Sequence, residues 1–354
     1  MEIRFATILL TVLSIATAAP LWAAESRSVP AASQSRAGII SPTHYAGPVP
    51  RYTALVRELT WYDPARNRPL PALIYYPSSD LRCPVVLFST GLGRSRDDCA
   101  YLGRFWASCG YVAVFLQHKG SDEAARQGAV RPKKQKNHLR MAFDNPENIR
   151  DRPRDVIFAI NRLGQMKRNA DPLGDRLDLE RIGASGHDFG AQTVLALAGQ
   201  VLPGDIMIVD PRVKAVVAMS PPVPLGQVPL RVAYADIHVP CLHITGTADN
   251  SIVATTQASQ RRLPFDYTQG PDEYLIVLRG ADHRTYSGHP FPRRNGWADG
   301  VFQQLIAQSS TAFWDAYLKG DADAKRWLSD GGLGGLLGGT ATLEKKIGRQ
   351  PSDR

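Results

Sequence analysis

Residues 181–199 read RIGASGHDFGAQTVLALAG: a short apolar segment, a turn with glycines at 186 and 190, and a longer apolar segment. The first segment has the length of a buried strand and the last that of a helix. The turn between them forces Asp188 into a strained backbone conformation, and its neighbours must lack bulk for strand and helix to approach. Asp188 then stands at the start of a helix, whose dipole favours negative charge. The spacing is typical of a nucleophile elbow, with Asp where Ser is commonest.

Strand-like and helix-like segments alternate on both sides of this turn. We expect strands over residues 53–62, 70–76, 84–89, 111–116, 181–184, 213–219, 241–245 and 274–278, and helices over 99–109, 150–163, 188–199 and 301–318. Short apolar runs such as PVVLFS at 84–89 indicate strands buried on both faces. The alternation predicts an α/β fold, a mostly parallel central sheet with helices on both faces. About twenty residues separate the strands near 219 and 241, too few for a large cap domain.

The rest of the chain divides into four parts. Residues 1–23 are expected to be a signal peptide, because Arg4 precedes an apolar stretch too short to span a membrane; a retained anchor is the alternative. Residues 24–50 are rich in Ser, Ala, Pro and Gly and indicate a linker. Residues 51–320 are expected to form one α/β domain, and 321–354, with GGLGGLLGG at 331–339, a loosely ordered tail. The sequence thus predicts a secreted or periplasmic protein without a membrane span in the mature chain.

Charge excludes some partners. The 354 residues include 42 Lys and Arg and 33 Asp and Glu, a net charge of +9, with acidic residues among the basic ones along most of the chain. The one dense basic run, RPKKQK at 131–136, contains no aromatic residue. A nucleic-acid-binding protein would show a larger basic stripe or a known module. We therefore expect no nucleic-acid partner and interpret the run as a solvated loop; the oligomeric state is left open.

The four cysteines are Cys83, Cys99, Cys109 and Cys241. Cys99 and Cys109 fall on one predicted helix, where ten residues rise about 15 Å, beyond the reach of a disulfide. The sequence has no Cys-x-x-Cys motif and shows no tight His/Cys cluster, so a metal site is not expected. We expect all four cysteines to be small buried apolar side chains.

Further motifs surround the turn. They are FSTGLGRSRDD at 88–98, YLGRFWASCGYVAV at 101–114, QHKGSD at 117–122, HITGTADNS at 243–251 and GADHRTYSG at 280–288. With residues 182–199 they resemble, in order, the α/β-hydrolase superfamily, and within it the dienelactone-hydrolase-like and platelet-activating-factor-acetylhydrolase-like esterases. The resemblance covers most of the chain between 84 and 318. It implies an α/β-hydrolase fold and a hydrolase for a small-molecule substrate, with no cofactor or metal.

Three residues match the family's catalytic positions. Asp188 falls on the nucleophile, Asp249 on the acid after the strand at 241–245, and His283 on the base after the strand at 274–278. Nucleophile, acid and base follow one another as this fold requires. Asp210 is the competing acid, but it precedes a strand instead of following one. Ser185 lies within the strand before the turn and cannot replace Asp188.

Neighbouring positions receive supporting roles. The backbone N–H groups of Leu92 and Phe189 are the expected oxyanion-hole donors, although Thr90-Gly91 stands where the family usually carries His-Gly. His187 is expected only to fill the turn. His118 and Asp122 follow another strand and are expected near the rim of the pocket.

An aspartate changes the chemistry. Attack by a carboxylate on an ester carbonyl would produce an anhydride, whereas attack on saturated carbon gives an alkyl ester. The string GHDFGA is also similar to the elbows of epoxide hydrolases and dehalogenases, although Phe189 cannot donate a hydrogen bond to a halide. Three hypotheses remain: a hydrolase of esterase ancestry acting on a small ester-type substrate, which the sequence favours; an Asp-nucleophile hydrolase of alkyl halides or epoxides; and a catalytically inactive binding relative.

Overall fold

The computed structural model describes residues 45–126, 132–224, 226–288 and 296–348. The predicted signal peptide and most of the predicted linker lie outside these residues. Among the described residues no helix is long and apolar enough to cross a membrane.

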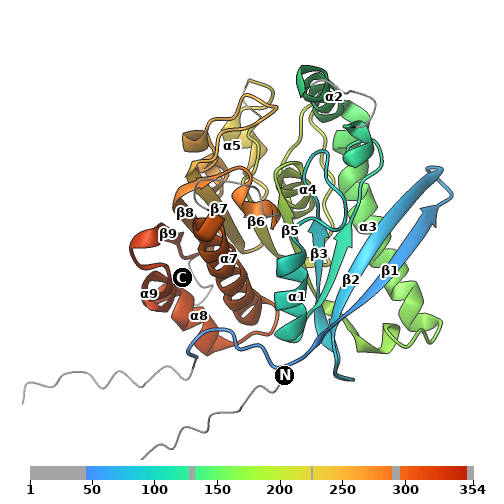
Figure 1. Ribbon diagram of the computed structural model, residues 1–354, viewed down its shortest axis with the longest axis vertical. Helices are drawn as coiled ribbons and strands as arrows, with labels where there is room; N and C mark the ends of the chain where they lie inside the picture. Colours follow the sequence, from blue (N-terminus) through green and yellow to red (C-terminus); the bar gives the residue numbers. More distant parts are fainter. Residues whose placement is uncertain (1–44, 127–131, 225, 289–295, 349–354) are drawn as a thin grey trace, which may run out of the picture. The chain divides into compact units, whose positions relative to one another are not determined.

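One sheet of nine strands organises the described chain, in the order β1-β2-β4-β3-β5-β6-β7-β8-β9 (Figure 1). Six strands run parallel at its centre: β3 (Cys83–Ser89), β4 (Val112–Leu116), β5 (Leu177–His187), β6 (Val213–Met219), β7 (Cys241–Ala248) and β8 (Glu273–Asp282). An antiparallel hairpin of β1 (Ala54–Asp63) and β2 (Arg68–Pro77) adds to one edge. The antiparallel strand β9 (Ala341–Lys346) closes the other. The predicted α/β class and the eight predicted strands are confirmed.

Helices cover both faces of the sheet. One face packs against α1 (Ala100–Ser108), α7 (Gly296–Tyr317), α8 (Ala322–Ser329) and α9 (Gly332–Leu337), through aromatic side chains such as Trp106 and Trp314. The other packs against α3 (Pro146–Arg168) and α4 (Phe189–Ala198), through Val156, Ile160 and Val194. Two apolar layers therefore bury the sheet on both sides, as its continuous apolar strands require. The short helices α5 (Leu230–Ala233) and α6 (Leu263–Tyr267) lie in the connections flanking β7, and no cap domain follows β6 among the described residues.

The structure corrects three sequence expectations about how the chain is divided. Within the predicted tail of residues 321–354, the described residues 321–348 are not loose, because α8 and α9 pack on the core and β9 pairs with β8 from Glu273 to Leu278. The domain therefore extends past residue 320, and at its start Tyr45 donates to Asp315 and packs on Trp327. The basic run is also not a loop, since helix α2 (Pro132–Asp144) begins within it and turns Leu139 and Phe143 towards an apolar cluster.

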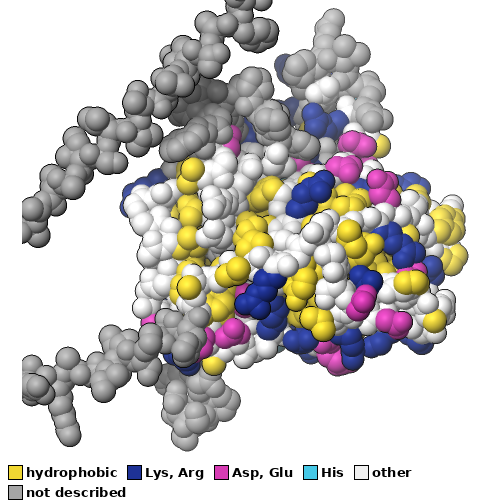
Figure 2. Space-filling view, turned by 60° about the horizontal axis from the view of Figure 1, so that its bottom comes forward, with side chains coloured by type: hydrophobic (Ala, Val, Ile, Leu, Met, Phe, Trp, Pro, Cys, Tyr) yellow, Lys and Arg dark blue, Asp and Glu magenta, His cyan; other side chains and the backbone are white. Residues whose placement is uncertain are grey.

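Surface charge is mixed. On the face drawn in Figure 2, Lys and Arg side chains are interspersed with Asp and Glu and with apolar groups. The positive net charge is therefore not gathered into one stripe on that face.

The sheet brings the candidate site together. Because β3 to β8 are parallel, the residues that follow their carboxyl ends meet at one edge of the sheet. Asp188 follows β5, Ser220 follows β6, Asp249 follows β7 and His283 follows β8. These four positions, nearly one hundred residues apart at the extremes, lie within side-chain reach of one another.

Candidate active site

The turn at Asp188 is strained and tightly packed. Asp188 has φ 53° and ψ −120° and caps the amino end of α4, while its N–H donates to the carbonyl of Met219 over 3.0 Å. A Cβ at Gly190 would overlap the backbone of Ser89, and one at Gly186 would overlap that of Gly190. Both glycines are therefore required sterically, and the turn holds the Asp188 carboxylate above the sheet edge.

The two carboxylate oxygens of Asp188 have different neighbours. Oδ2 accepts a hydrogen bond from the backbone N–H of Leu92 over 3.3 Å. Oδ1 lies 3.6 Å from Nε2 of His283. The Asp188 side chain is 13% exposed, so a small molecule can reach it. One oxygen thus sits at the predicted oxyanion donor, and the other faces the imidazole.

The opposite nitrogen of His283 faces Asp249. Its Nδ1 lies 3.0 Å from Oδ1 of Asp249, which is completely buried. Since a carboxylate only accepts hydrogen bonds, this contact places the proton on Nδ1 and leaves the lone pair of Nε2 turned towards Asp188. The three residues predicted from sequence therefore form a connected Asp–His–Asp arrangement.

The buried acid is densely coordinated. Besides His283, the Asp249 carboxylate accepts hydrogen bonds from the hydroxyls of Ser220 (2.9 Å), Thr245 (3.0 Å) and Tyr286 (3.3 Å). Hydrogen bonds of this number hold a buried carboxylate in one orientation. Asp210, the competing acid, instead pairs with the half-exposed Arg212 before β6 and takes no part.

Two residues of this arrangement were not found from the sequence. Ser220 has φ 54° at the carboxyl end of β6, and its Oγ lies 3.0 Å from Nδ1 of His283. Arg261 is completely buried, with Nε 3.2 Å from Asp249 Oδ1 and Nη2 3.3 Å from His283 Nδ1. Arg261 balances the charge of the buried acid. Ser220 shares the signal of following a strand, whereas nothing near Arg261 in sequence marks it.

A cavity of about 360 Å³ opens on Asp188 and His283. Its apolar wall comes from the loop after β3, from α2 and from the segment after β7, namely Leu92, Leu139, Phe143, Ile252 and Val253. Four basic residues also line it: Arg94, Arg126, Lys136 and Arg284. Among the described residues that line this cavity, Asp188 is the only acidic one. The site therefore presents an apolar wall and a cationic rim to a small ligand.

His187 is more than a filler of the turn. It is buried, lines the cavity, and lies with its ring 5.0 Å from the rings of both His283 and Tyr286. Burial, reinforced by His283, lowers the pKa of His187 well below its usual value. An uncharged imidazole therefore forms the wall next to the candidate base.

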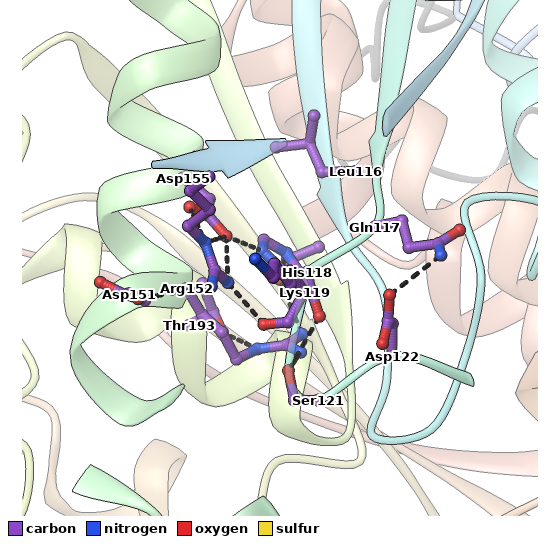
Figure 3. Close-up of polar contacts among 12 residues, drawn as sticks. Leu116, Gln117, His118, Lys119, Ser121, Asp122, Asp151, Arg152, Asp155 and Thr193 are labelled. Atoms are coloured by element: carbon purple, nitrogen blue, oxygen red, sulfur yellow. Dashed lines mark hydrogen bonds and ion pairs between the residues drawn. The ribbon is translucent and has the colours of Figure 1, made fainter. Parts of the chain in front are cut away.

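His118 and Asp122 do not line the cavity rim, contrary to the expectation from sequence. His118 is completely buried, with Nε2 2.9 Å from Ser89 Oγ and Nδ1 3.0 Å from Asp155 Oδ2 (Figure 3). Burial and the charge of Arg152 lower the pKa of His118 to about 4. Asp122 accepts from Gln117 over 3.0 Å. His118 therefore belongs to a buried polar network with Ser89 and Asp155, and Asp122 to a separate pair with Gln117.

The cysteines behave as expected, but the sequence missed one cluster. All four cysteines are free and buried. Cys241 pairs in register with Glu273 on β8, and with His243 these residues offer possible metal ligands within 4.8 Å of one another. His243 Nε2 lies 2.7 Å from Glu273 Oε2, a hydrogen-bond distance; two ligands of one tetrahedral zinc ion would be about 3.3 Å apart. The geometry is that of a hydrogen-bonded trio, in which burial raises the pKa of Glu273.

The sheet order and the strained turn define an α/β-hydrolase fold. No family model matches the chain. It is 22% identical to a platelet-activating factor acetylhydrolase of Canis lupus familiaris, over 73% of this chain and 62% of that protein. It is 23% identical to the cutinase est2 of Thermobifida alba, over 75% of this chain and 69% of that protein. The chain thus spans less than two thirds of the first relative. The chain is thus similar to an acetylhydrolase and to a cutinase.

Proposed function

We propose that this protein hydrolyses small ester-type substrates through Asp188, His283 and Asp249, and that it cuts the bond between oxygen and the alkyl carbon. The observation that carries the proposal is the placement of the Asp188 carboxylate. Its Oδ2 accepts a hydrogen bond from the N–H of Leu92, and its Oδ1 faces the cavity beside His283. Within the esterase ancestry, descent from the dienelactone-hydrolase-like branch is part of the proposal.

This placement favours a covalent alkyl ester over an acyl intermediate. A serine enzyme keeps its oxyanion donors for the carbonyl oxygen of the substrate. Here the Leu92 N–H already binds the side chain of Asp188. It would stabilise the negative charge that develops on Oδ2 when water attacks the carboxyl carbon of an Asp188 ester. Attack on the acyl carbon would instead give an anhydride, which is high in energy.

The reaction has two balanced steps. Oδ1 of Asp188 attacks the alkyl carbon, an Asp188 alkyl ester forms, the carbon–oxygen bond breaks, and its electron pair leaves with the carboxylate. Water then gives a proton to Nε2 of His283 and attacks the carboxyl carbon of Asp188. The tetrahedral intermediate expels the alcohol oxygen, which takes the proton back from His283, and the resulting Asp188 acid loses its proton to solvent. Asp249 holds His283 in the required tautomer throughout.

The cavity indicates which esters suit this chemistry. A carboxylate leaves saturated carbon readily when ring strain or another activation assists, as in a four-membered lactone. The basic residues Arg94, Arg126 and Lys136 line the cavity and would stabilise a leaving carboxylate, and the apolar side chains would hold the alkyl part. Cationic groups placed where charge develops lower the barrier.

A second candidate, hydrolysis of alkyl halides or epoxides, uses the same first step. The open Oδ1 of Asp188 and the donor on Oδ2 favour it equally. We rank it below the ester because two proteins that the chain resembles are an acetylhydrolase and a cutinase.

Oxygen isotopes decide between the mechanisms. Excess enzyme would turn over a strained lactone, short esters, haloalkanes and epoxides once each in heavy-oxygen water. The proposal expects one heavy oxygen in the peptide that contains Asp188, and none in the released carboxylate. Heavy oxygen in the released carboxylate alone would contradict alkyl–oxygen cleavage. Heavy oxygen in the Asp188 peptide with haloalkanes or epoxides only would favour the second candidate. No turnover of any substrate would favour an inactive relative. Asp210→Asn serves as the matched control.

Export of the protein is part of the proposal. It rests on the charged and apolar pattern of residues 1–23. Amino-terminal sequencing of protein recovered outside the cytoplasm should begin near residue 24. A chain that keeps residue 1 would contradict it.

A further inference from the structure

The most unusual side chain near the site is that of Arg152 on α3, which is completely buried. Its guanidinium donates to the hydroxyls of Ser89 (3.1 Å), Ser121 (2.8 Å) and Thr193 (3.0 Å) and to the carbonyl of Thr90. It also lies 4.6 Å from the ring centroid of Phe189. These partners come from three places: the end of β3 with the residue after it, the loop after β4, and α4, which begins at Phe189 directly after Asp188. Figure 3 shows Arg152 between Thr193 and Ser121, with Asp155 and His118 beside them.

We propose that Arg152 is a positioning residue, which holds the loop around Leu92 so that the Leu92 N–H meets the Asp188 carboxylate. The inference rests on the proposed function, because it assigns a role in the second step of that reaction.

Both flanks of Leu92 are tied to Arg152. On one side, the Thr90 carbonyl accepts directly from the guanidinium. On the other, the Gly93 N–H donates to the Ser121 carbonyl over 2.8 Å, and the Ser121 hydroxyl accepts from Arg152. A shift of the guanidinium would therefore move the loop from both ends.

The turn that carries Asp188 is tied to the same group. The Thr193 hydroxyl accepts from Arg152 and donates to the Phe189 carbonyl over 2.8 Å. The guanidinium also faces the Phe189 ring, a contact that is strongest when desolvated. Arg152 thus connects the loop around Leu92 with Phe189, the residue after Asp188. It thereby fixes the distance between the Leu92 N–H and Asp188 Oδ2.

The partners of Arg152 suit this role better than a role in charge pairing. The hydrogen-bond acceptors found for it among the described residues are three hydroxyls and one carbonyl, all uncharged. Asp155, the nearby acid on α3, is bonded instead by Arg68 and His118. Burial lowers the pKa of Arg152 to about 9, with Asp155 and Asp188 opposing the shift, so it remains charged at neutral pH. Burying a guanidinium costs desolvation free energy. Its five N–H donors in a fixed geometry allow it in return to bridge several segments of the chain.

The role predicts a specific kinetic signature. The Leu92 N–H assists the hydrolysis of the Asp188 ester, where charge builds on Oδ2, and not its formation, where charge leaves. In Arg152→Lys, which keeps the charge but loses the bridge, kcat should fall roughly 10- to 100-fold. KM should fall with it, kcat/KM should stay within about threefold, and the Asp188 ester should accumulate in the intact mass. Arg68→Lys is the matched control, because Arg68 bonds Asp155 and the Lys119 carbonyl but none of the four groups that accept from Arg152.

Milder variants keep the test decisive if Arg152→Lys does not fold. Ser121→Ala and Thr193→Val each remove one acceptor and should shift kcat and KM in the same direction by a few fold. Equal losses in kcat and kcat/KM, or an Arg68→Lys variant that behaves like Arg152→Lys, would overturn the positioning role while the label on wild-type Asp188 persists. Absence of that label in the wild type overturns the proposed function itself, and with it this inference.

Discussion

Replacing Asp249 with Asn removes one charge from a carboxylate that accepts from many donors in a completely buried site. The substitution keeps the size of the side chain but exchanges one acceptor oxygen for an NH₂ group, which can only donate. Three of the donors are hydroxyls that can turn and accept, whereas His283 Nδ1 and Arg261 Nε cannot. The buried guanidinium of Arg261 then lacks its counter-charge.

Magnitudes follow from these contacts. Leaving one partner of a buried ion pair unpaired costs about 3–5 kcal/mol, which is a large share of the stability of a typical domain but leaves it folded at 25 °C. Without an acceptor at Nδ1, His283 loses the tautomer that turns the Nε2 lone pair towards Asp188. In a Ser–His–Asp triad the same change lowers kcat on the order of 10⁴-fold. We expect a fall on the order of 10³- to 10⁴-fold here, with the Asp188 ester accumulating.

The assay compares kcat, intact mass during turnover and urea unfolding for Asp249→Asn and Asp210→Asn. Asp210 pairs with Arg212 away from the cavity, so Asp210→Asn should keep kcat within about twofold. If Asp249→Asn retains kcat within tenfold of wild type while its unfolding is unchanged, the acid is misassigned and the orientation of His283 does not depend on it.

Further consequences can be measured together. His283→Gln should form the Asp188 ester in one burst per active site and then stall, because the base acts only in the second step; intact mass after mixing reports it, and an ester-free enzyme would refute the order of steps. Asp188→Ser should gain cleavage of p-nitrophenyl acetate, because the Leu92 N–H becomes free for a substrate carbonyl, and no gain would indicate that the cavity cannot seat an acyl group. For His118, the unfolded chain takes up a proton below pH 6.5 but the folded protein only near pH 4, so stability is lost as pH falls. The loss from this group between pH 7 and pH 5 should be about 2 kcal/mol by urea unfolding, and His118→Gln should flatten that slope; an unchanged slope would contradict it. The four buried thiols should resist a thiol reagent in the native protein and all react after unfolding, whereas rapid native labelling would show that they are accessible.

The catalytic candidates were predictable because each carries a local signal. The turn at Asp188 is recognised from consecutive residues, because two glycines stand between a strand-like segment and a helix-like one. Asp249 and His283 each follow a strand of the parallel sheet directly, and the topology brings such positions together. The geometry agrees with these sequence expectations, while the catalytic roles themselves stay predictions.

What the sequence did not reveal depends on contacts between distant segments. The edge strand β9 follows a glycine-rich stretch, and apolar and polar residues alternate only weakly along it. Only its pairing with β8 therefore makes it a strand. Helix α2 is highly charged, and it is recognised by Leu139 and Phe143, which reach the apolar cluster at the cavity. Arg261 and Arg152 reach the site from α-helical or loop positions through long side chains. No local pattern distinguishes them from the other arginines, which within the described part of the chain are exposed or half-buried except for Arg68.

Two similar arrangements in this molecule show what selects the reactive one. Ser89, His118 and Asp155 are connected through 2.9 and 3.0 Å contacts, the connectivity of a Ser–His–Asp triad. All three are completely buried, and none lines the cavity at Asp188. Ser89 Oγ also accepts a hydrogen bond from Arg152, which fixes the Ser89 hydroxyl next to the loop that contains Leu92. A Ser–His–Asp chain of contacts that is closed off from the cavity therefore only supports the surrounding loops and cannot meet a substrate. The strained turn adds exposure to the cavity, and because the residue it exposes is Asp188, the chemistry available to the site is that of a carboxylate.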